Sequence, residues 1–275
     1  MTEAALLRVD GVAAAGVPAD DRGLAYGDGV FETLLLHGGR VVWWAALLQR
    51  LELGCAALGL GAPSRRLWRA DLDALLAAAG PGRRVLKLTA SAGSGRRGYR
   101  RDAAEPVRRI ARLLPAPPSL PACDGGIAVR WCELRLAAQP RLAGLKHLNR
   151  LEQVLARAEW DDPAIAEGLL CDGDGNLVSA TAANLFVVVD GRLLTPPLEQ
   201  CGVAGTCRQF LLPAAEVRRL SPQDLLAADE VFVCNSLRGI LPVTRLGTRR
   251  WPIGPVTRAQ GARLAAAEPA FAVEW

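Results

Sequence analysis

Lysine is almost absent from this sequence. Lys87 and Lys146 are the only two lysines, against 31 arginines. A guanidinium stays protonated in proteins, whereas an ammonium can lose its proton and act as a nucleophile, a base or a Schiff-base partner. Amine chemistry is therefore restricted to two positions, and Lys146, within AGLKHLNRLEQ (143–153), is a candidate reactive group.

Histidine and paired cysteines are also scarce. The chain has two histidines, His37 and His147, and seven widely spaced cysteines, no two of which form a CxxC pair. The odd number and the spacing argue against both a zinc site and a disulfide framework. The first residues lack the basic and apolar pattern of a signal peptide. We therefore expect no metal site and a reduced, cytoplasmic protein.

Long runs of one residue type are missing as well. The formal net charge is +5, but the arginines are scattered among acids, and only five Phe and two Tyr could stack on bases. No apolar run reaches the length that spans a membrane. We expect neither nucleic acid nor a membrane as a partner, and a modest positive charge suits an anionic small substrate.

Strands and helices are intermixed along the chain. Strands are predicted over 34–42, folded back at Gly38-Gly39, and over 85–91, where Lys87 faces outward. A helix is predicted over 67–79, and HLNRLEQVLARAEW (147–160) predicts an amphipathic helix that begins at or just after Lys146. Its expected apolar face comprises Leu148, Leu151, Val154, Leu155 and Ala158.

A domain boundary is predicted where proline accumulates. Four prolines within RLLPAPPSLPAC (112–123) indicate a stiff connector that continues neither a helix nor a central strand. The sequence therefore predicts a smaller N-terminal α/β domain over 1–114, a connector over 115–123 and a larger C-terminal domain over 124–275. Because the elements lack a strict βαβ rhythm, the predicted class is α+β or mixed α/β.

Three glycine-rich stretches could bind ligands. Residues 93–98 match GxGxxG, but no apolar-periodic helix follows, so a loop is predicted instead of a dinucleotide site. CDGDGN (171–176) lacks the twelfth-position glutamate of a calcium loop and predicts a turn. GVAGTCRQFLL (202–212) predicts a turn that opens into a helix, an arrangement that can bind an anion such as phosphate.

Several stretches together resemble one enzyme family. They are DRGLAYGDGVFET (21–33), the LQRL around Arg50, GLKHLNRLEQ (144–153), ANLF (183–186) and GVAGTCRQ (202–209). Their order and spacing are similar to those of fold-type IV pyridoxal phosphate enzymes, which include branched-chain and D-amino-acid aminotransferases and 4-amino-4-deoxychorismate lyase. The resemblance implies a two-domain homodimer that uses pyridoxal 5′-phosphate, a cofactor that needs a reactive lysine and a phosphate site.

The resemblance also implies roles for individual residues. Lys146 would bind the cofactor covalently and move protons, and Arg50 would pair with the cofactor phosphate. The other expected cofactor-binding residues are Ser179, Asn184 near the cofactor edge, the backbone of Ala204, Gly205 and Thr206, and the pair Asn235 and Ser236. Ser179 departs from the family pattern, which has a glutamate there to hold the pyridine nitrogen protonated.

Ser179 favours elimination over transamination. A carboxylate at the ring nitrogen makes the cofactor a strong electron sink, which transamination needs, whereas a serine leaves a weaker one. GLKHLNRLEQ and the GSGRRGY loop also most resemble the lyase, whose substrate, 4-amino-4-deoxychorismate, carries two carboxylates. Arg96 and Arg97 with Tyr99 are the candidate carboxylate clamp, although the family arginine before the glycines is replaced by Ala92.

Two other functions stay open at this point. The nearer one is an aminotransferase on the same fold that acts on D-amino or branched-chain acids without the ring-nitrogen carboxylate. The further one is a non-catalytic basic binding protein, whose nucleic-acid affinity would fall steeply with salt.

Overall fold

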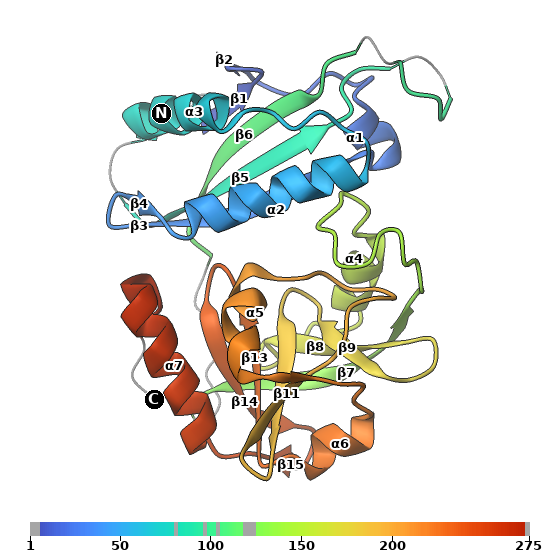
Figure 1. Cartoon of the computed structure of the whole chain (residues 1–275), viewed down its shortest axis with the longest axis vertical. Coiled ribbons are helices and arrows are strands. Elements are labelled where there is room, and N and C mark those ends of the chain that lie inside the picture. Colours follow the sequence, from blue (N-terminus) through green and yellow to red (C-terminus); the bar gives the residue numbers. More distant parts are fainter. Residues whose placement is uncertain (1–5, 80–81, 96–97, 103–104, 118–124, 273–275) are drawn as a thin grey trace. The chain divides into compact units, whose positions relative to one another are not determined.

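The structure, a computed structural model, describes residues 6–79, 82–95, 98–102, 105–117 and 125–272, and it divides into two compact units (Figure 1). Unit 1 ends at Pro117, inside the predicted 115–123 connector, but also includes Lys146–Asn149. The sequence had placed Lys146 in the C-terminal domain. This is a correction, and its cause is a set of backbone hydrogen bonds between Lys146–Asn149 and the first unit.

Unit 1 is built on a six-stranded sheet in the order β2-β1-β6-β5-β3-β4. The strands are β1 (Leu7–Val9), β2 (Val12–Ala13), β3 (Gly29–His37), β4 (Arg40–Val41), β5 (Arg84–Ser91) and β6 (Arg108–Pro115). Every pairing is antiparallel, and β5 lies between β3 and β6 over its whole length. Successive side chains of a strand point to opposite faces, so β3 and β5 each present two different faces.

Helices cover one face of this sheet. They are α2 (Trp44–Ala57) and α3 (Arg65–Ala79), while the short α1 (Arg22–Tyr26) precedes β3. Leu47, Leu51 and Leu75 of the helices form one core with alternate strand residues such as Leu34 and Leu88. The strand residues that alternate with these apolar ones point away from the helices. Among these are Phe31, Thr33 and Lys87, none of which is fully buried.

Unit 2 contains a nine-stranded sheet that closes on itself. Its strands are β7 (Ile127–Leu136), β8 (Glu167–Asp172), β9 (Leu177–Ala180), β10 (Asn184–Val189), β11 (Arg192–Thr195), β12 (Glu216–Val217), β13 (Glu230–Asn235), β14 (Gly239–Leu246) and β15 (Arg249–Arg250). The order is β12-β11-β10-β13-β14-β7-β8-β9, and β9 pairs again with β10. Six strands therefore form a closed ring, which leaves no unpaired edge among them.

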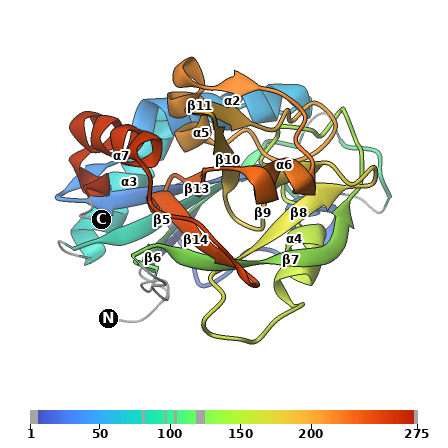
Figure 2. The same cartoon turned by 90° about the horizontal axis from the view of Figure 1, so that it is seen from below.

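Four helices accompany this ring, namely α4 (Leu151–Arg157), α5 (Thr206–Leu211), α6 (Pro222–Ala227) and α7 (Pro255–Ala267). Seen from below, α7 lies along β13 and β14 (Figure 2). The ring encloses an apolar core that includes Leu169, Leu185 and Val233. The mixture of helices and strands in both units confirms the predicted α+β class.

The helix after Lys146 differs from its prediction. It begins at Leu151, five residues beyond Lys146, so the lysine lies in extended backbone and not at a helix start. The expected apolar face is also largely uncovered, because Leu151, Val154 and Leu155 are 67%, 61% and 53% exposed. Helical periodicity identified a real apolar stripe, but it could not show whether the same chain covers that stripe.

Further predictions about strands and turns are confirmed. Gly38-Gly39 joins β3 to β4, and β5 covers the strand predicted over 85–91. The described residues between Gly98 and β6 contain no helix, and CDGDGN forms the turn between β8 and β9. The six described cysteines are free thiols and buried, and Cys123 lies outside the described residues. Among the described helices, none is long and apolar enough to cross a membrane.

Candidate active site

The Lys146 segment is fixed to the first residues of β3. The Phe31 N–H donates to the Lys146 carbonyl at 3.0 Å, and the Leu148 N–H donates to the Gly29 carbonyl at 2.9 Å. His147 forms an antiparallel bridge with Val30 between these two bonds. Lys146–Asn149 therefore runs along the start of β3 as an additional short strand, and its backbone position does not depend on a helix.

Both lysines of the chain lie against one aromatic ring. Lys146 Nζ is 4.3 Å from the centroid of the Phe31 ring, and Lys87 Nζ is 5.1 Å from the same centroid. Lys87 is exposed on β5, as predicted, but its contact with Phe31 places it beside the candidate reactive group. The sequence missed this relationship. The scarcity of lysine was the available signal, and it applied to both positions equally.

Arg50 is held by a buried carboxylate. Its Nε and Nη2 atoms donate to Glu32 Oε1 and Oε2 at 2.7 and 2.6 Å, and the Glu32 side chain is almost fully buried in β3. A two-point pair of this kind fixes the plane of the guanidinium. Glu32 immediately follows Phe31, so one strand orients both the Lys146 segment and Arg50.

In unit 2, the glycine-rich turn is held at two places. On one side, the Gly144 N–H donates to the Gly202 carbonyl and the Ala204 N–H donates to the Gly144 carbonyl, both at 3.0 Å. On the other side, Asn184 Nδ2 donates to the Val203 carbonyl at 2.8 Å, and Asn184 Oδ1 accepts from the Gly205 N–H at 3.1 Å. The Asn184 amide therefore acts as a brace for residues 203–205.

These bonds change which backbone N–H groups of the turn could bind the cofactor phosphate. The backbone N–H groups of Ala204 and Gly205, two of the three predicted donors, donate to protein acceptors. The third, Thr206, begins α5, and α5 has no side-chain cap. The first N–H groups of a helix have no acceptor within the helix, so those of Thr206 and Cys207 are the donors that this turn offers a ligand.

A buried positive charge lies in the same short helix. Arg208 is buried, and it donates to Thr195 Oγ1 at 3.3 Å and to the Pro196 carbonyl at 2.9 Å. Among the described residues, no carboxylate pairs with it. Burial lowers the pKa of this guanidinium, because a charge without a counter-ion is costly in the interior. The donor set around Thr206 therefore suits an anion.

Ser179 and Asn184 are opposite each other on β9 and β10. The turn between them is held by the buried Glu167, whose carboxylate accepts from the Thr181 hydroxyl and from backbone N–H groups that include Ala182. Burial raises the pKa of Glu167, and these hydrogen bonds offset part of the rise. Ser179 is buried beside this turn.

The remaining predicted residues differ in what they contact. Asn235 Oδ1 accepts from the Leu237 and Arg238 N–H groups at 3.0 and 2.9 Å, and its Nδ2 donates to the Ala182 carbonyl, so its amide shapes the turn that contains Ser236. Tyr99 is 87% exposed. Arg96 and Arg97 lie outside the described residues.

Comparison with known proteins identifies the family. The profile of the family described as "Amino-transferase class IV" matches residues 29–246, which include the Lys146 segment, Arg50 and the braced turn. The chain belongs to the class IV aminotransferase family. This confirms the resemblance seen in the sequence. Enzymes of this family work with pyridoxal 5′-phosphate, so the implied cofactor is confirmed as well.

Two members of the family are similar to this chain over nearly its whole length. An aminodeoxychorismate lyase from Vibrio harveyi is 37% identical over 263 residues, covering 91% of this chain and 96% of that protein. The crystal structure of 4-amino-4-deoxychorismate lyase from Pseudomonas aeruginosa has a TM-score of 0.88 at 44% identity and covers 96% of this chain and 99% of that one. A D-alanine aminotransferase from Listeria innocua is 27% identical.

Proposed function

We propose that this member of the family is a lyase that converts 4-amino-4-deoxychorismate to 4-aminobenzoate, a folate precursor, and pyruvate. The observation that carries the proposal is the near-complete match to lyases, in which 44% identity extends over both units. Ser179 supports it, because elimination tolerates a weaker electron sink than transamination does. The match to aminotransferases of the family is weaker.

Lys146 carries the proton transfers in this proposal. Lys146 would hold pyridoxal phosphate covalently until the substrate amine displaces it, which frees Nζ as a base, and the cofactor would supply the electron sink for the elimination. Lys146 Nζ removes the proton from the amine-bearing ring carbon of the substrate, the carbon–oxygen bond to the enolpyruvyl group breaks, and a proton is returned to the enolpyruvyl methylene. A positioned base contributes about 10²–10⁴-fold to such a step.

We assign the cofactor phosphate to two sets of donors. The N–H groups of Thr206 and Cys207 would bind it. Arg50, whose guanidinium is fixed by Glu32, is the charged group that the family resemblance assigns to the phosphate. Asn184, Ala204 and Gly205 would act through the shape of their turn instead of by direct contact. Ser236 would add a hydroxyl, and Asn235 would hold the turn that presents it.

We assign the substrate carboxylates to cations of unit 1. Lys87 is the supporting observation, because its ammonium is exposed and lies over the same ring as Lys146 Nζ. The loop that carries Arg96, Arg97 and Tyr99 stays the second candidate. Replacing Lys87 by Met should raise the KM for the substrate, whereas trapping of the cofactor on Lys146 should continue.

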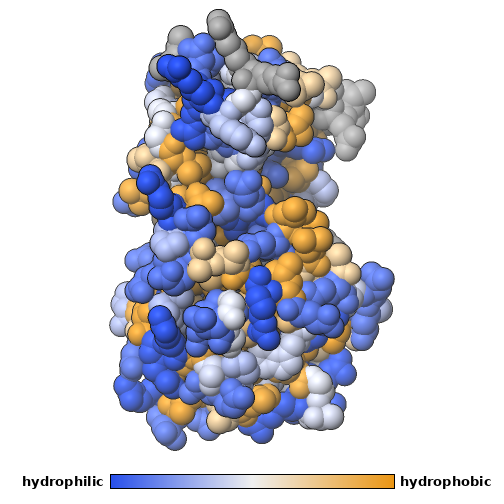
Figure 3. Space-filling view, turned by 90° about the vertical axis from the view of Figure 1, so that its right-hand side faces the viewer, coloured by the Kyte–Doolittle hydropathy of each residue, from blue (hydrophilic) through white to orange (hydrophobic). Residues whose placement is uncertain are grey.

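We further propose a homodimer that acts in the cytoplasm. The free, buried thiols suit a reducing compartment. The apolar stripe of Leu151, Val154 and Leu155 on α4 supports self-association, because contiguous exposed apolar surface marks contact sites. Figure 3 views the side of the chain on which α4 lies in Figure 1, and apolar side chains gather on this side of unit 2.

One experiment tests the proposed function. The purified protein should show visible cofactor absorbance, and borohydride should fix the cofactor on Lys146, as identified by mass spectrometry. The protein should then release 4-aminobenzoate from enzymatically prepared 4-amino-4-deoxychorismate, and Lys146→Arg should abolish the release. Trapping on Lys87 would overturn the assignment of Lys146. Conversion of the cofactor to its amine form by an amino donor, without 4-aminobenzoate release, would favour the aminotransferase.

A further inference from the structure

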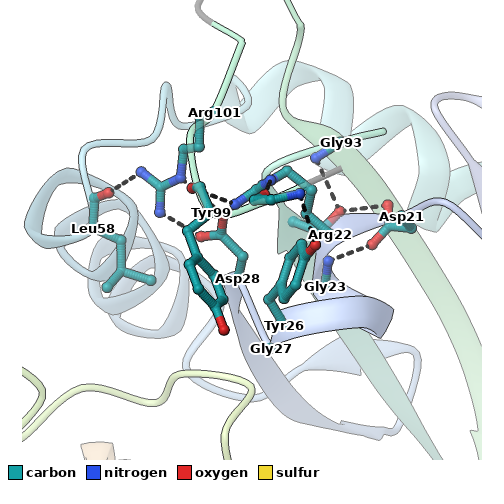
Figure 4. Close-up of polar contacts among 12 residues, drawn as sticks. Asp21, Arg22, Gly23, Tyr26, Gly27, Asp28, Leu58, Gly93, Tyr99 and Arg101 are labelled. Atoms are coloured by element: carbon teal, nitrogen blue, oxygen red, sulfur yellow. Dashed lines mark hydrogen bonds and ion pairs between the residues drawn. The ribbon is translucent and has the colours of Figure 1, made fainter. Parts of the chain in front are cut away.

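A single carboxylate joins two arginines beside the GSGRRGY loop. Asp28 Oδ2 accepts from Arg22 Nε and from Arg101 Nε, each at 2.9 Å, and Asp28 Oδ1 accepts from Arg101 Nη2 (Figure 4). All three side chains belong to unit 1. The residues come from α1, from the turn before β3 and from the segment after the loop. We name this group the Arg22–Asp28–Arg101 clasp.

Arg22 connects the clasp to the backbone of the loop. Its Nη1 donates to the Gly98 carbonyl at 3.0 Å and its Nη2 donates to the Tyr99 carbonyl at 2.9 Å. The Arg22 N–H also donates to the Gly93 carbonyl at 2.8 Å. One buried residue therefore bonds to the backbone at Gly93 and again at residues 98 and 99. Among the described residues, Asp28 is the only carboxylate that pairs with Arg22.

Arg101 closes the other side of the clasp. Its Nη1 donates to the Leu58 carbonyl at the end of α2, so the segment that leaves the loop is connected to that helix. Tyr99, between the two arginines, contacts Tyr26 edge to face at a centroid distance of 5.6 Å, and the Gly98 N–H donates to the Tyr26 hydroxyl at 3.3 Å. Residues 98–101 thus have a defined conformation although Tyr99 is exposed.

The stretch that carries Asp28 also holds the reactive lysine. Gly29 and Phe31 form the backbone hydrogen bonds with Leu148 and Lys146, and the Gly27 carbonyl accepts from Asn149 Nδ2 at 3.3 Å. Gly27 has a φ of 65°, which favours glycine, and a Cβ added there would lie 2.3 Å from Asn149 Oδ1. Residues 27–31 therefore contact the Lys146 segment through their backbone and the loop through Asp28.

We propose that Asp28 is a positioning residue for substrate recognition, because it fixes residues 98–101 to the same five-residue stretch that fixes Lys146. The inference rests on the proposed function, in which the segment that includes Tyr99 is the second candidate, after Lys87, for binding a substrate carboxylate. Without Asp28, Arg22 is a buried guanidinium that lacks a carboxylate, and Arg101 loses its two-point partner. The loop then loses its fixed position, while the backbone bonds that hold Lys146 are retained.

The test compares Asp28→Asn with Glu52→Gln in the holoenzyme. Glu52 forms a two-point pair with Arg65 at 2.7 Å for both bonds, but this pair is exposed on α2 and α3, so it is a matched control. Asp28→Asn should raise the KM for 4-amino-4-deoxychorismate by about tenfold or more and change kcat by less than about threefold. Amide exchange in residues 98–102 should become faster, and borohydride should still fix the cofactor on Lys146.

Each outcome decides one point. Unchanged amide exchange in 98–102, or a KM equal to that of Glu52→Gln, overturns the inference. If Asp28→Asn does not fold, Arg101→Lys is used instead, because lysine keeps the positive charge but cannot form a two-point pair with Asp28. The same increases in KM and in amide exchange are expected for this variant. Their absence overturns the inference. If the wild-type protein releases no 4-aminobenzoate, the proposed function fails, and faster exchange in the variant still supports the clasp.

Discussion

Ser179 and Asn184 face each other across β9 and β10, and this one pair closes the ring of strands in unit 2. Ser179 is buried, and the Asn184 amide braces residues 203–205. Asn184 therefore has two roles: it pairs with β9 to close the ring, and its side chain fixes the turn before α5. Cofactor affinity should depend on this brace, although Asn184 need not touch the cofactor.

Replacing Asn184 by Asp tests the brace. The substitution keeps the size of the side chain but removes the Nδ2 donor to the Val203 carbonyl and adds a negative charge beside the turn. Affinity of the apoenzyme for pyridoxal phosphate should fall by about tenfold or more, as measured by absorbance titration. Asn176→Asp makes the same chemical change in the turn between β8 and β9 and should leave that affinity unchanged. Equal affinities in the two variants would contradict the brace.

Gly205 should tolerate no side chain. Its φ of −70° and ψ of 144° suit any residue, so backbone strain is not the reason. A Cβ at this position would lie 2.1 Å from Asn184 Oδ1. Gly205→Ala should therefore cost about 1–3 kcal/mol of the free energy of unfolding and weaken cofactor binding.

The matched control for Gly205→Ala is Gly173→Ala, where an added Cβ meets nothing within 4 Å. The double variant Gly205→Ala with Asn184→Ala should be less unstable than the sum of the two single variants, because the second change removes the clash. Urea unfolding measures the wild type and the four variants. Strict additivity would show that the clash is not the cause.

Sequence patterns were sufficient for the local features of this fold. The stretch 85–91 predicted β5, and paired glycines predicted the β3–β4 turn. The motif around Lys146 was one of the stretches that identified the family, but its periodicity predicted a helix that begins at or just after Lys146, whereas the helix begins at Leu151. The hydrogen bonds that hold Lys146 come from β3, more than a hundred residues earlier in the chain, and local periodicity carries no signal for them.

The same limit explains the other misses. Asn184 and Gly205 are 21 residues apart in sequence, and only the folded chain shows that the amide occupies the space a Cβ would need. Lys87 was interpreted as an ordinary strand residue because alternation gives the direction of a side chain but not its neighbours. The sequence gives the number of acidic residues and arginines, but it does not show which of them form pairs.

The α4 stripe should control oligomeric state. Val154 is 61% exposed at the centre of the stripe, and a glutamate there would place a charge inside an apolar contact. Val154→Glu should shift the protein from dimer to monomer in size-exclusion chromatography with light scattering. Val217→Glu is the control, because Val217 is also exposed but lies on β12. A wild-type monomer, or a dimer that survives Val154→Glu, would contradict the proposed interface.

Glu167 should make stability depend on pH in an unusual direction for a carboxylate. Burial raises its pKa above the ordinary value of 4.5, so the folded state prefers the protonated form. The stability that Glu167 contributes is therefore fully present below about pH 4.5 and is lost as pH rises through the folded pKa. Each unit of rise corresponds to about 1.4 kcal/mol.

Glu167→Gln removes this titration. The difference in free energy of unfolding between wild type and Glu167→Gln should favour the wild type most at low pH and decline as pH rises above about 4.5. The glutamine also loses acceptors for the Thr181 hydroxyl and the Ala182 N–H, which shifts the whole curve but not its slope. Glu199→Gln, at an exposed carboxylate, serves as the control in the same urea series. A difference that grows with pH would show that the hydrogen bonds outweigh burial.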